Sequence, residues 1–422
     1  MTRFPIHPPL PQVFAPLGRP ATAMWVLKPP RQNFIITKMN QSSAGLKSKP
    51  HFEILDGLRG VAAIIVLGFH LLEAHAANAF TQIINHGYLA VDFFFLLSGF
   101  VVGYAYDDRW GKMSSWDFFK RRLIRLHPLV ILGSLIGAVC FYFGASAVFP
   151  LIHDTPIWKV LAVMLVGCTL IPILPSMDIR GWQEMHPLNG PAWSLFFEYV
   201  ANLLYALIVR RFSRTLLAIL VLAAGGVLLH FALTSHEGDF IGGWTVDGPQ
   251  LRIGFTRMMY PFFAGLLLFP MGKLIRIQHA FWVCSGLIAI ILAMPRIGGP
   301  DHVWWNGLYE AFCIIVLFPL IVALGAGGSL QGKYPTRICG FLGDISYPIY
   351  ITHYPLIYLY TAWVGDKHLS LAQSYPGALL VFFGSFALAY ACLKLYDEPA
   401  RNWLRRRFLA ESGANVVPFA RH

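Results

Sequence analysis

The sequence predicts an all-α protein, a polytopic bundle of helices embedded in a membrane. Of its 422 residues, 56% are hydrophobic and 13% are charged, about half the charged fraction of a soluble domain. Apolar runs of about 17–22 residues recur along almost the whole chain, and each can cross a hydrocarbon core of ~30 Å. The runs are 57–76, 88–106, 128–149, 157–174, 192–209, 215–234, 255–271, 279–295, 306–325, 342–364 and 376–396.

The basic residues indicate a membrane topology rather than nucleic-acid binding. The net charge is +12, but the cations lie in short clusters between apolar runs, which is typical of cytoplasmic connectors. With a cytoplasmic N-terminus, all five clusters fall inside only if 157–174 does not cross, and its Pro172 and Pro175 fit a broken segment. We therefore predict about ten transmembrane helices, a re-entrant or non-spanning 157–174, and cytoplasmic termini in a bacterial inner membrane. The clusters are Arg121/Arg122/Arg125, Arg210/Arg211/Arg214, Lys273/Arg276, Lys333/Arg337 and Arg405/Arg406/Arg407.

The chain divides into one membrane domain with a segment on either side. Residues 1–50 are rich in Pro, Ser and Lys and contain no long apolar run, so we expect a disordered N-terminal extension. The membrane domain covers 51–403, and 404–422 form a basic cytoplasmic tail. Six cysteines are scattered singly without a CxxC pair, so neither a disulfide framework nor a zinc site is expected.

Two polar residues in the first apolar run are the strongest indication of function. Arg59 and His70 are eleven residues apart, which at ~100° per residue places them within ~20° of one another and ~16 Å apart along a helix. Ionisable side chains inside a membrane segment are expensive unless they face an interior or a site. We therefore expect both to face the interior of the bundle.

Two carboxylates and a second imidazole are expected at the depth of His70. Asp92 follows the start of the run 88–106, Glu198 follows that of 192–209, and His353 lies near the middle of 342–364. Asp92 or Glu198 would orient His70 by accepting from one ring nitrogen, which leaves the other nitrogen as a general base. Structural roles stay open for these residues: an ion pair with a buried arginine for Glu198, an acid at a helix end for Asp92, and packing for His353.

Six stretches of the chain, in order, resemble the acyltransferase-3 family of bacterial integral-membrane acyltransferases. They are LDGLRGVAAIIVLGFH, GYLAVDFFFLLSGFVVGY, FFKRRLIRLHPL, NGPAWSLFFEYVANLLY, GDISYPIYITHYPL and YDEPARNWL, and they cover about 51–403. The resemblance implies transfer of an acyl group, most often acetyl and sometimes succinyl or longer, from acyl-CoA to a carbohydrate hydroxyl. The SGNH-type esterase domain fused to some family members is not expected here, which favours direct transfer.

The resemblance also implies roles for single residues. His70 matches the family's essential histidine, and Arg59 matches its partner arginine. The other matching positions are Asp92 and Ser98 in the second stretch, Arg122 and Arg125 in the third, Trp193, Ser194 and Glu198 in the fourth, and Ser346, Tyr347 and His353 in the fifth.

The residues agree with this chemistry. The phosphates of CoA need cations at the cytosolic mouth, where Arg59, Arg122 and Arg125 are expected. His70 would deprotonate a hydroxyl of a carbohydrate or glycolipid acceptor presented from the other side, although an acyl-histidine intermediate stays open. The candidate oxyanion donors are Ser98, Ser194 and Tyr347. We expect acyl-CoA as co-substrate and no permanently bound cofactor or metal, and the alternative function is a proton-coupled secondary transporter.

Overall fold

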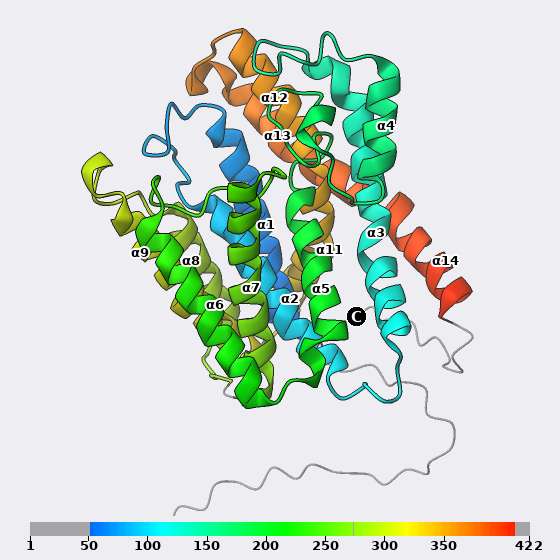
Figure 1. Ribbon diagram of the computed structural model, residues 1–422, viewed down its shortest axis with the longest axis vertical. Helices are drawn as coiled ribbons and strands as arrows, with labels where there is room; N and C mark the ends of the chain where they lie inside the picture. Colours follow the sequence, from blue (N-terminus) through cyan, green and yellow to red (C-terminus); the bar gives the residue numbers. More distant parts are fainter. Residues whose placement is uncertain (1–50, 273, 410–422) are drawn as a thin grey trace, which may run out of the picture. The chain divides into compact units, whose positions relative to one another are not determined.

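The computed structural model describes residues 51–272 and 274–409, so the predicted extension and most of the predicted tail lie outside the described residues. The described residues form helices and no strand, which confirms the predicted all-α class (Figure 1). The helices are α1 (Glu53–Glu73), α2 (Ala90–Tyr106), α3 (Ser115–Cys140), α4 (Ile157–Gly167), α5 (Ala192–Leu207), α6 (Arg214–Thr234), α7 (Gly248–Met271), α8 (Ala280–Ala293), α9 (Trp304–Phe312), α10 (Phe318–Gly327), α11 (Lys333–Thr352), α12 (Tyr354–Asp366), α13 (Leu371–Ala391) and α14 (Glu398–Phe408).

Eight helical segments of the described chain are long and apolar enough to cross a membrane. Two of them each contain two α-helices: a π-helical turn joins α9 to α10, and another joins α13 to α14, so that the boundary predicted at 403/404 falls inside a helix. Of the remaining predicted spans, α8 is apolar but has only 14 residues, and α11 has 20 residues with a polar first half. The eight segments are Glu53–Glu73, Gly87–Tyr106, Ser115–Gly144, Ala192–Arg211, Arg214–Thr234, Gly248–Met271, Trp304–Gly327 and Leu371–Phe408.

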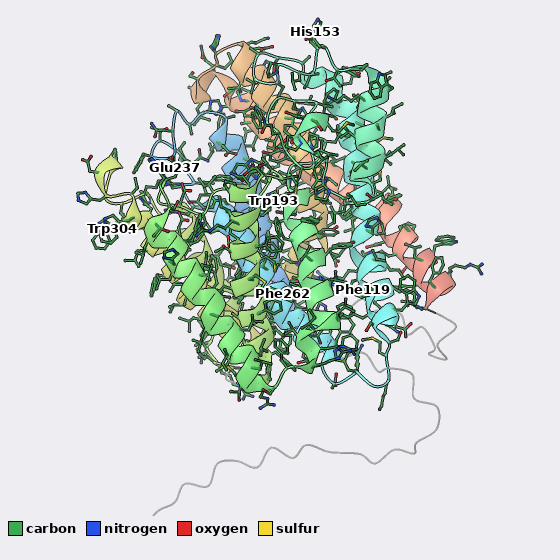
Figure 2. The ribbon with its side chains drawn as sticks, in the orientation of Figure 1. Phe119, His153, Trp193, Glu237, Phe262 and Trp304 are labelled. Carbon is green, nitrogen blue, oxygen red and sulfur yellow. The ribbon has the colours of Figure 1, made fainter. Side chains whose placement is uncertain are left out.

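The segment predicted not to span the membrane contains one short helix. Helix α4 has 11 residues, which corresponds to ~16 Å and is about half of a hydrocarbon core. It packs beside α3 near the end of the bundle where Figure 2 shows His153. The connectors α2–α3 and α5–α6 lie at the opposite end (Figure 1).

Two predicted boundaries are wrong, for different local reasons. Helix α3 starts at Ser115 rather than 128, because Ser114 and Asp117 form a reciprocal capping box that begins the helix before its apolar part. Its basic residues, predicted to lie in a connector, are therefore helical. The run 342–364 is two helices, α11 and α12, which break at His353, two residues before Pro355.

Glycines allow the central helices to approach closely. At Gly60 an added Cβ would lie 2.4 Å from the backbone oxygen of Leu342. The backbone of α11 therefore occupies the place that a side chain on α1 would need. At Gly99 in α2 an added Cβ would lie 1.9 Å from the oxygen of Phe262 in α7. Small residues serve this purpose in membrane bundles, where close packing replaces the hydrophobic effect as a driving force.

This packing gives a first prediction. Gly60→Ala should destabilise the protein by about 1–3 kcal/mol, because the neighbouring backbone oxygen cannot move aside as a flexible side chain would. The measurement is the unfolding temperature of the purified protein in detergent. Gly226→Ala in α6 is the matched control, since an added Cβ there meets nothing within 4 Å. Equal unfolding temperatures for the two variants would show that α1 and α11 are not packed in this way.

Candidate active site

His70 lies in the last turn of α1 and forms a pair with a carboxylate on the same helix. Its Nδ1 is 2.9 Å from Oε2 of Glu73, one turn further along. The His70 side chain is 19% exposed and that of Glu73 is 53% exposed. Donation from Nδ1 to the carboxylate fixes the tautomer in which Nε2 carries the lone pair. The pair therefore has the arrangement of a histidine base with its orienting acid.

The second predicted imidazole, that of His353, lies against the first. The two rings are stacked with centroids 5.6 Å apart and planes at 28°. Nδ1 of His353 is 2.9 Å from the oxygen of Ile349 and 3.0 Å from that of Tyr350, so it donates to carbonyls in the last turn of α11. Its Nε2 is buried and has no hydrogen-bond partner among the described residues.

A tyrosine directly after the helix break completes the surroundings of His70. The ring of Tyr354 meets that of His70 edge to face, with centroids 4.9 Å apart. Its hydroxyl forms no hydrogen bond within the described part of the chain. Neither the apolar pattern nor the motifs singled out Tyr354, because its position depends on the break at His353.

Arg59 is held at the other end of the same interface. Its Nε donates to Oγ of Ser346 at 2.8 Å, and its Nη2 lies 3.1 Å from Oδ1 of Asp56. Arg59 and His70 therefore both face α11: Arg59 contacts Ser346, and His70 contacts His353. The expectation that Arg59 and His70 share one face agrees with these contacts.

Arg125 from α3 joins Arg59 in a cationic cluster. It is half-buried and interacts electrostatically with Arg59, Arg122 and Asp56. Within the described residues it forms no direct hydrogen bond or ion pair. Of the three arginines predicted to bind phosphate, Arg125 is therefore the one without a direct hydrogen bond or ion pair in the described residues.

Glu198 does not orient His70, which corrects the first of the two predicted pairings. It forms an ion pair with Arg122 and accepts a hydrogen bond of 2.8 Å from Oγ of Ser98. Arg122 is 6% exposed, so leaving its buried charge without a counter-ion would be costly. The Glu198 carboxylate supplies that counter-ion and is therefore not available to His70. This cluster links α2, α3 and α5 and also occupies Ser98.

Asp92 does not orient His70 either. It is fully buried and binds Arg257 of α7 through Nη2 at 2.7 Å, with Nε at 3.2 Å. Arg257 also donates to the oxygens of Tyr88 and Gly242, and its guanidinium lies 5.2 Å from the ring of Trp193. Asp92 and Trp193 therefore belong to a structural arginine site, for which the motifs gave no signal.

The two remaining predicted oxyanion donors are bonded elsewhere. The Ser194 Oγ is 2.7 Å from the hydroxyl of Tyr350, and the Tyr347 hydroxyl donates to the oxygen of Leu126 at 2.6 Å. These bonds connect α11 to α5 and α3. No contact of either side chain with His70 is found in the described structure.

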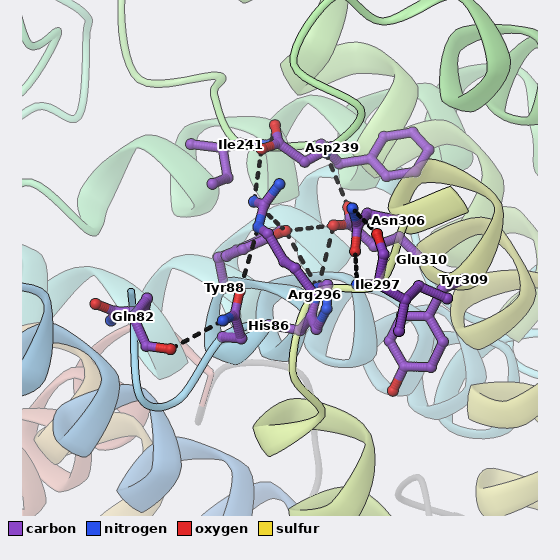
Figure 3. Close-up of polar contacts among 12 residues, drawn as sticks. Gln82, His86, Tyr88, Asp239, Ile241, Arg296, Ile297, Asn306, Tyr309 and Glu310 are labelled. Atoms are coloured by element: carbon purple, nitrogen blue, oxygen red, sulfur yellow. Dashed lines mark hydrogen bonds and ion pairs between the residues drawn. The ribbon is translucent and has the colours of Figure 1, made fainter. Parts of the chain in front are cut away.

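A buried polar network near the start of α2 also escaped the sequence analysis (Figure 3). Glu310 accepts from the Tyr88 hydroxyl and from the backbone nitrogen of Phe240. Arg296 binds Asp239 at 2.6 Å and donates to Tyr88. These residues come from four separate segments, so only the folded chain brings them together.

A third buried group lies in the long segment between α4 and α5. Glu184 accepts a hydrogen bond of 2.5 Å from the hydroxyl of Tyr358, and the Arg180 guanidinium lies 3.7 Å from the Tyr358 ring. Burial raises the pKa of Glu184 from its ordinary value of 4.5 to about 7, although the Tyr358 hydrogen bond and Arg180 lower it.

An imidazole–carboxylate pair at the end of a membrane helix is a candidate for general-base chemistry. Comparison with known proteins gives the class of the protein, because residues 52–394 match the family model of the acyltransferase-3 domain, described as an acyltransferase domain. The chain belongs to this family, which confirms the resemblance found in the sequence. It is a multi-pass membrane acyltransferase.

Individual relatives of this chain have between 25% and 36% sequence identity to it. The chain is 36% identical to protein 2 in the picA locus of Rhizobium radiobacter, over 43% of this chain and 94% of that protein. It is 25% identical to the O-acetyltransferase OatA of Staphylococcus aureus, over 72% of this chain and half the length of OatA. It is also 25% identical to the acyltransferase MdmB of Streptomyces mycarofaciens, over 72% of this chain and 78% of MdmB. No solved structure shows significant similarity to it.

The raised pKa of Glu184 predicts a pH-dependent stability. The folded chain binds this proton more tightly than the unfolded chain, so the stability is complete below pH 4.5 and is lost as the pH rises towards 7. The shift corresponds to about 3 kcal/mol. Glu184→Gln keeps an acceptor for Tyr358 and should make the unfolding temperature higher than that of the parent at pH 8 but not at pH 4.

The control for this experiment is Glu237→Gln. Glu237 is exposed in a connector (Figure 2), and its replacement should leave the parent's pH dependence intact. If the difference in unfolding temperature between the parent and Glu184→Gln were the same at pH 8 and at pH 4, the raised pKa of Glu184 would be contradicted.

Proposed function

We propose that this membrane acyltransferase moves an acyl group, acetyl in the first place, from cytosolic acyl-CoA to a hydroxyl of a cell-surface or exported saccharide. The observation that carries the proposal is the His70–Glu73 pair at one end of α1, with the arginine cluster of Arg59 and Arg125 near the other end. A base and a phosphate-binding cluster on one helix suit a reaction whose two substrates approach from opposite sides.

The relatives support the type of reaction. OatA is an O-acetyltransferase and MdmB an acyltransferase, so transfer to oxygen, with acetyl as the group, is the reading that agrees with both. The match covers only half of OatA, and the acceptor of this chain is therefore argued from its own residues.

The proposed reaction uses His70 as a general base. Nε2 of His70 takes the proton of the acceptor hydroxyl as its oxygen attacks the thioester carbonyl carbon. The tetrahedral intermediate collapses with cleavage of the C–S bond, the thiolate of CoA leaves, and the proton on His70 neutralises it. Glu73 stabilises the imidazolium in between. An acyl-histidine route would instead leave label on His70 when the protein is given labelled acetyl-CoA without an acceptor.

Tyr354 is the hydroxyl best placed to stabilise the developing oxyanion. Its ring lies against His70, and its hydroxyl has no other partner within the described residues. Ser98, Ser194 and Tyr347 are each bonded to another group. A pre-positioned donor that is free in the resting enzyme is what this role requires.

The donor is proposed to enter at the end of the bundle that carries the connectors α2–α3 and α5–α6. This end would face the cytosol of a bacterial inner membrane, with both termini on that side, since basic residues concentrate there. The phosphates of CoA would bind Arg125 and Arg59, and the pantetheine arm would extend ~16 Å along α1 to His70. Arg122 would act on this cluster through its charge, because Glu198 occupies its guanidinium.

The transporter alternative would move a solute without consuming a CoA ester. Membership of an acyltransferase family gives it no support, and no observation on the described residues favours it over acyl transfer.

The role of His70 predicts a loss of rate without a loss of fold. His70→Ala should lower kcat by ~10²–10⁴-fold, the usual contribution of a general base. Glu73→Gln should lower kcat less, because Nε2 remains while its orientation is weakened. The measurement is release of free thiol from acetyl-CoA in the presence of acceptor, with folding checked by gel filtration.

The matched control is His230→Ala, since His230 is an exposed histidine near the corresponding end of α6. Its kcat should stay within twofold of the parent's. A His70→Ala protein that transfers acetyl at the parent's rate would refute the base.

The arginine cluster predicts a donor effect that depends on the phosphates. Arg125→Gln should raise the KM for acetyl-CoA about tenfold or more, the value of a hydrogen bond to a charged group, and should leave kcat within twofold. With S-acetylpantetheine, which lacks the nucleotide, parent and variant should show the same KM. Arg59→Gln should act similarly but also lower the unfolding temperature, because it breaks the bonds to Ser346 and Asp56.

The control is Arg252→Gln, because Arg252 is exposed near the start of α7, at the end of the bundle opposite to the arginine cluster. This variant should behave as the parent. If the KM of Arg125→Gln rises equally for both donors, Arg125 does not bind the nucleotide phosphates.

A further inference from the structure

A cavity of about 230 Å³ lies next to the His70–Glu73 pair, at the end of the bundle opposite to the arginine cluster. Glu73 belongs to both: it accepts from His70 and it lines the cavity. Phe69 lines the cavity too, and its ring lies 4.9 Å from that of His70. A ligand in this cavity would therefore be separated from the imidazole by a single side chain. Its main lining residues are Phe69, Glu73, Asn78, Gln82, Tyr88 and Arg296.

The wall of the cavity contains polar groups without a partner. Gln82 is 8% exposed, and its Nε2 donates to the oxygen of Phe69, but its Oε1 is buried without a hydrogen bond in the described structure. Arg296 uses Nε and Nη2 for Asn85, Tyr88 and Asp239, whereas its Nη1 has no partner within the described residues. Gln82 and Arg296, which both line the cavity, thus carry one acceptor and one donor without a partner in the described residues. A buried polar group of this kind is costly unless a ligand or water completes it.

The polar wall is held rigidly by the network of Figure 3. The Arg296 side chain is 2% exposed and is fixed by Asp239, which is itself 7% exposed. Tyr88 is anchored by Glu310, which is fully buried. Groups that are ordered before the ligand arrives lose little entropy on binding, as a specific site requires.

The charges around the cavity favour an uncharged ligand. Arg296 is neutralised by Asp239 and also interacts with Glu310. Glu73 is the carboxylate that lines the cavity. An anionic ligand would meet this carboxylate and a single cation that is already paired with Asp239, so its binding would be opposed.

We infer that this cavity is the acceptor subsite and that it takes one uncharged sugar ring of the acceptor. Gln82 Oε1 accepts from a sugar hydroxyl, Arg296 Nη1 donates to a sugar oxygen, and the ring of Phe69 supplies the apolar face that pyranoses pack against. This assignment rests on the proposed function for the statement that the ligand is the acceptor. Binding of a neutral sugar to the cavity stands without it.

The test separates binding from transfer. Ala79 lines the cavity and is half-buried, so the full-length Ala79→Cys protein is treated with a membrane-impermeant maleimide in the presence of methyl glucoside, N-acetylglucosamine or glucuronic acid. The two neutral sugars should slow labelling at millimolar concentration, and glucuronic acid should not. Adding Gln82→Met should raise the half-protecting concentration about tenfold, the effect of one lost hydrogen bond.

The matched control is Gln250→Met, the same replacement at the corresponding end of α7 and outside the cavity lining. It should leave protection unchanged. Acetyl transfer to the same sugars is measured in parallel, and there Gln82→Met should raise the acceptor KM about tenfold while the KM for acetyl-CoA stays constant.

The outcomes are distinct. Transfer to neutral sugars without protection of Ala79→Cys would overturn the cavity assignment and leave the proposed function standing. Protection by neutral sugars without any transfer would support the cavity and overturn the proposed function. Equal protection by glucuronic acid would overturn the uncharged class, and equal effects of Gln82→Met and Gln250→Met would overturn the role of Gln82.

Discussion

The close approach of α1 to α11 is the contact on which the site depends. At three positions along this interface, Gly57, Gly60 and Gly343, an added Cβ would lie within 3 Å of the opposite helix. With larger residues the helix axes would move apart, and two contacts would open together: Arg59 with Ser346, and the stacking of His70 on His353. The packing of glycines thus sets the geometry of ionisable groups that lie several turns away from one another.

The fold class and the shared face of Arg59 and His70 could be predicted from the sequence because both follow from local rules. Run length and composition specify membrane helices, and an eleven-residue spacing brings two side chains to one face of any α-helix. The break at His353 was missed because the apolar pattern of 342–364 continues through it. The helix breaks two residues before Pro355, which lacks an N–H and disfavours helical geometry in the residue before it, and Nδ1 of His353 reaches back to the oxygens of Ile349 and Tyr350 at the break.

The partner of His70 was predicted wrongly for a reason that applies to other membrane bundles. Asp92 and Glu198 were expected at the depth of His70, but buried cations compete for these carboxylates, and Arg257 and Arg122 bind them. Which arginine meets which acid depends on helix packing, which the sequence does not display. The actual partner, Glu73, needs no packing at all, since a residue three positions along the same helix is always within reach. For an ionisable group near a helix end, acids on its own helix deserve to be weighed before acids that are distant in sequence.

The separation of charges along α1 also constrains the reaction itself. The phosphates of a CoA donor cannot enter an apolar interior, so they would remain at the arginine cluster, while the thioester carbonyl is neutral and can extend between the helices. Chemistry at His70 would then leave the cations ~16 Å from the reacting atoms, too far to stabilise the oxyanion directly. The stabilising donor must come from the far end of the bundle, and Tyr354 lies there against the imidazole. Donor affinity and reaction rate would accordingly be controlled by different residues of one helix pair.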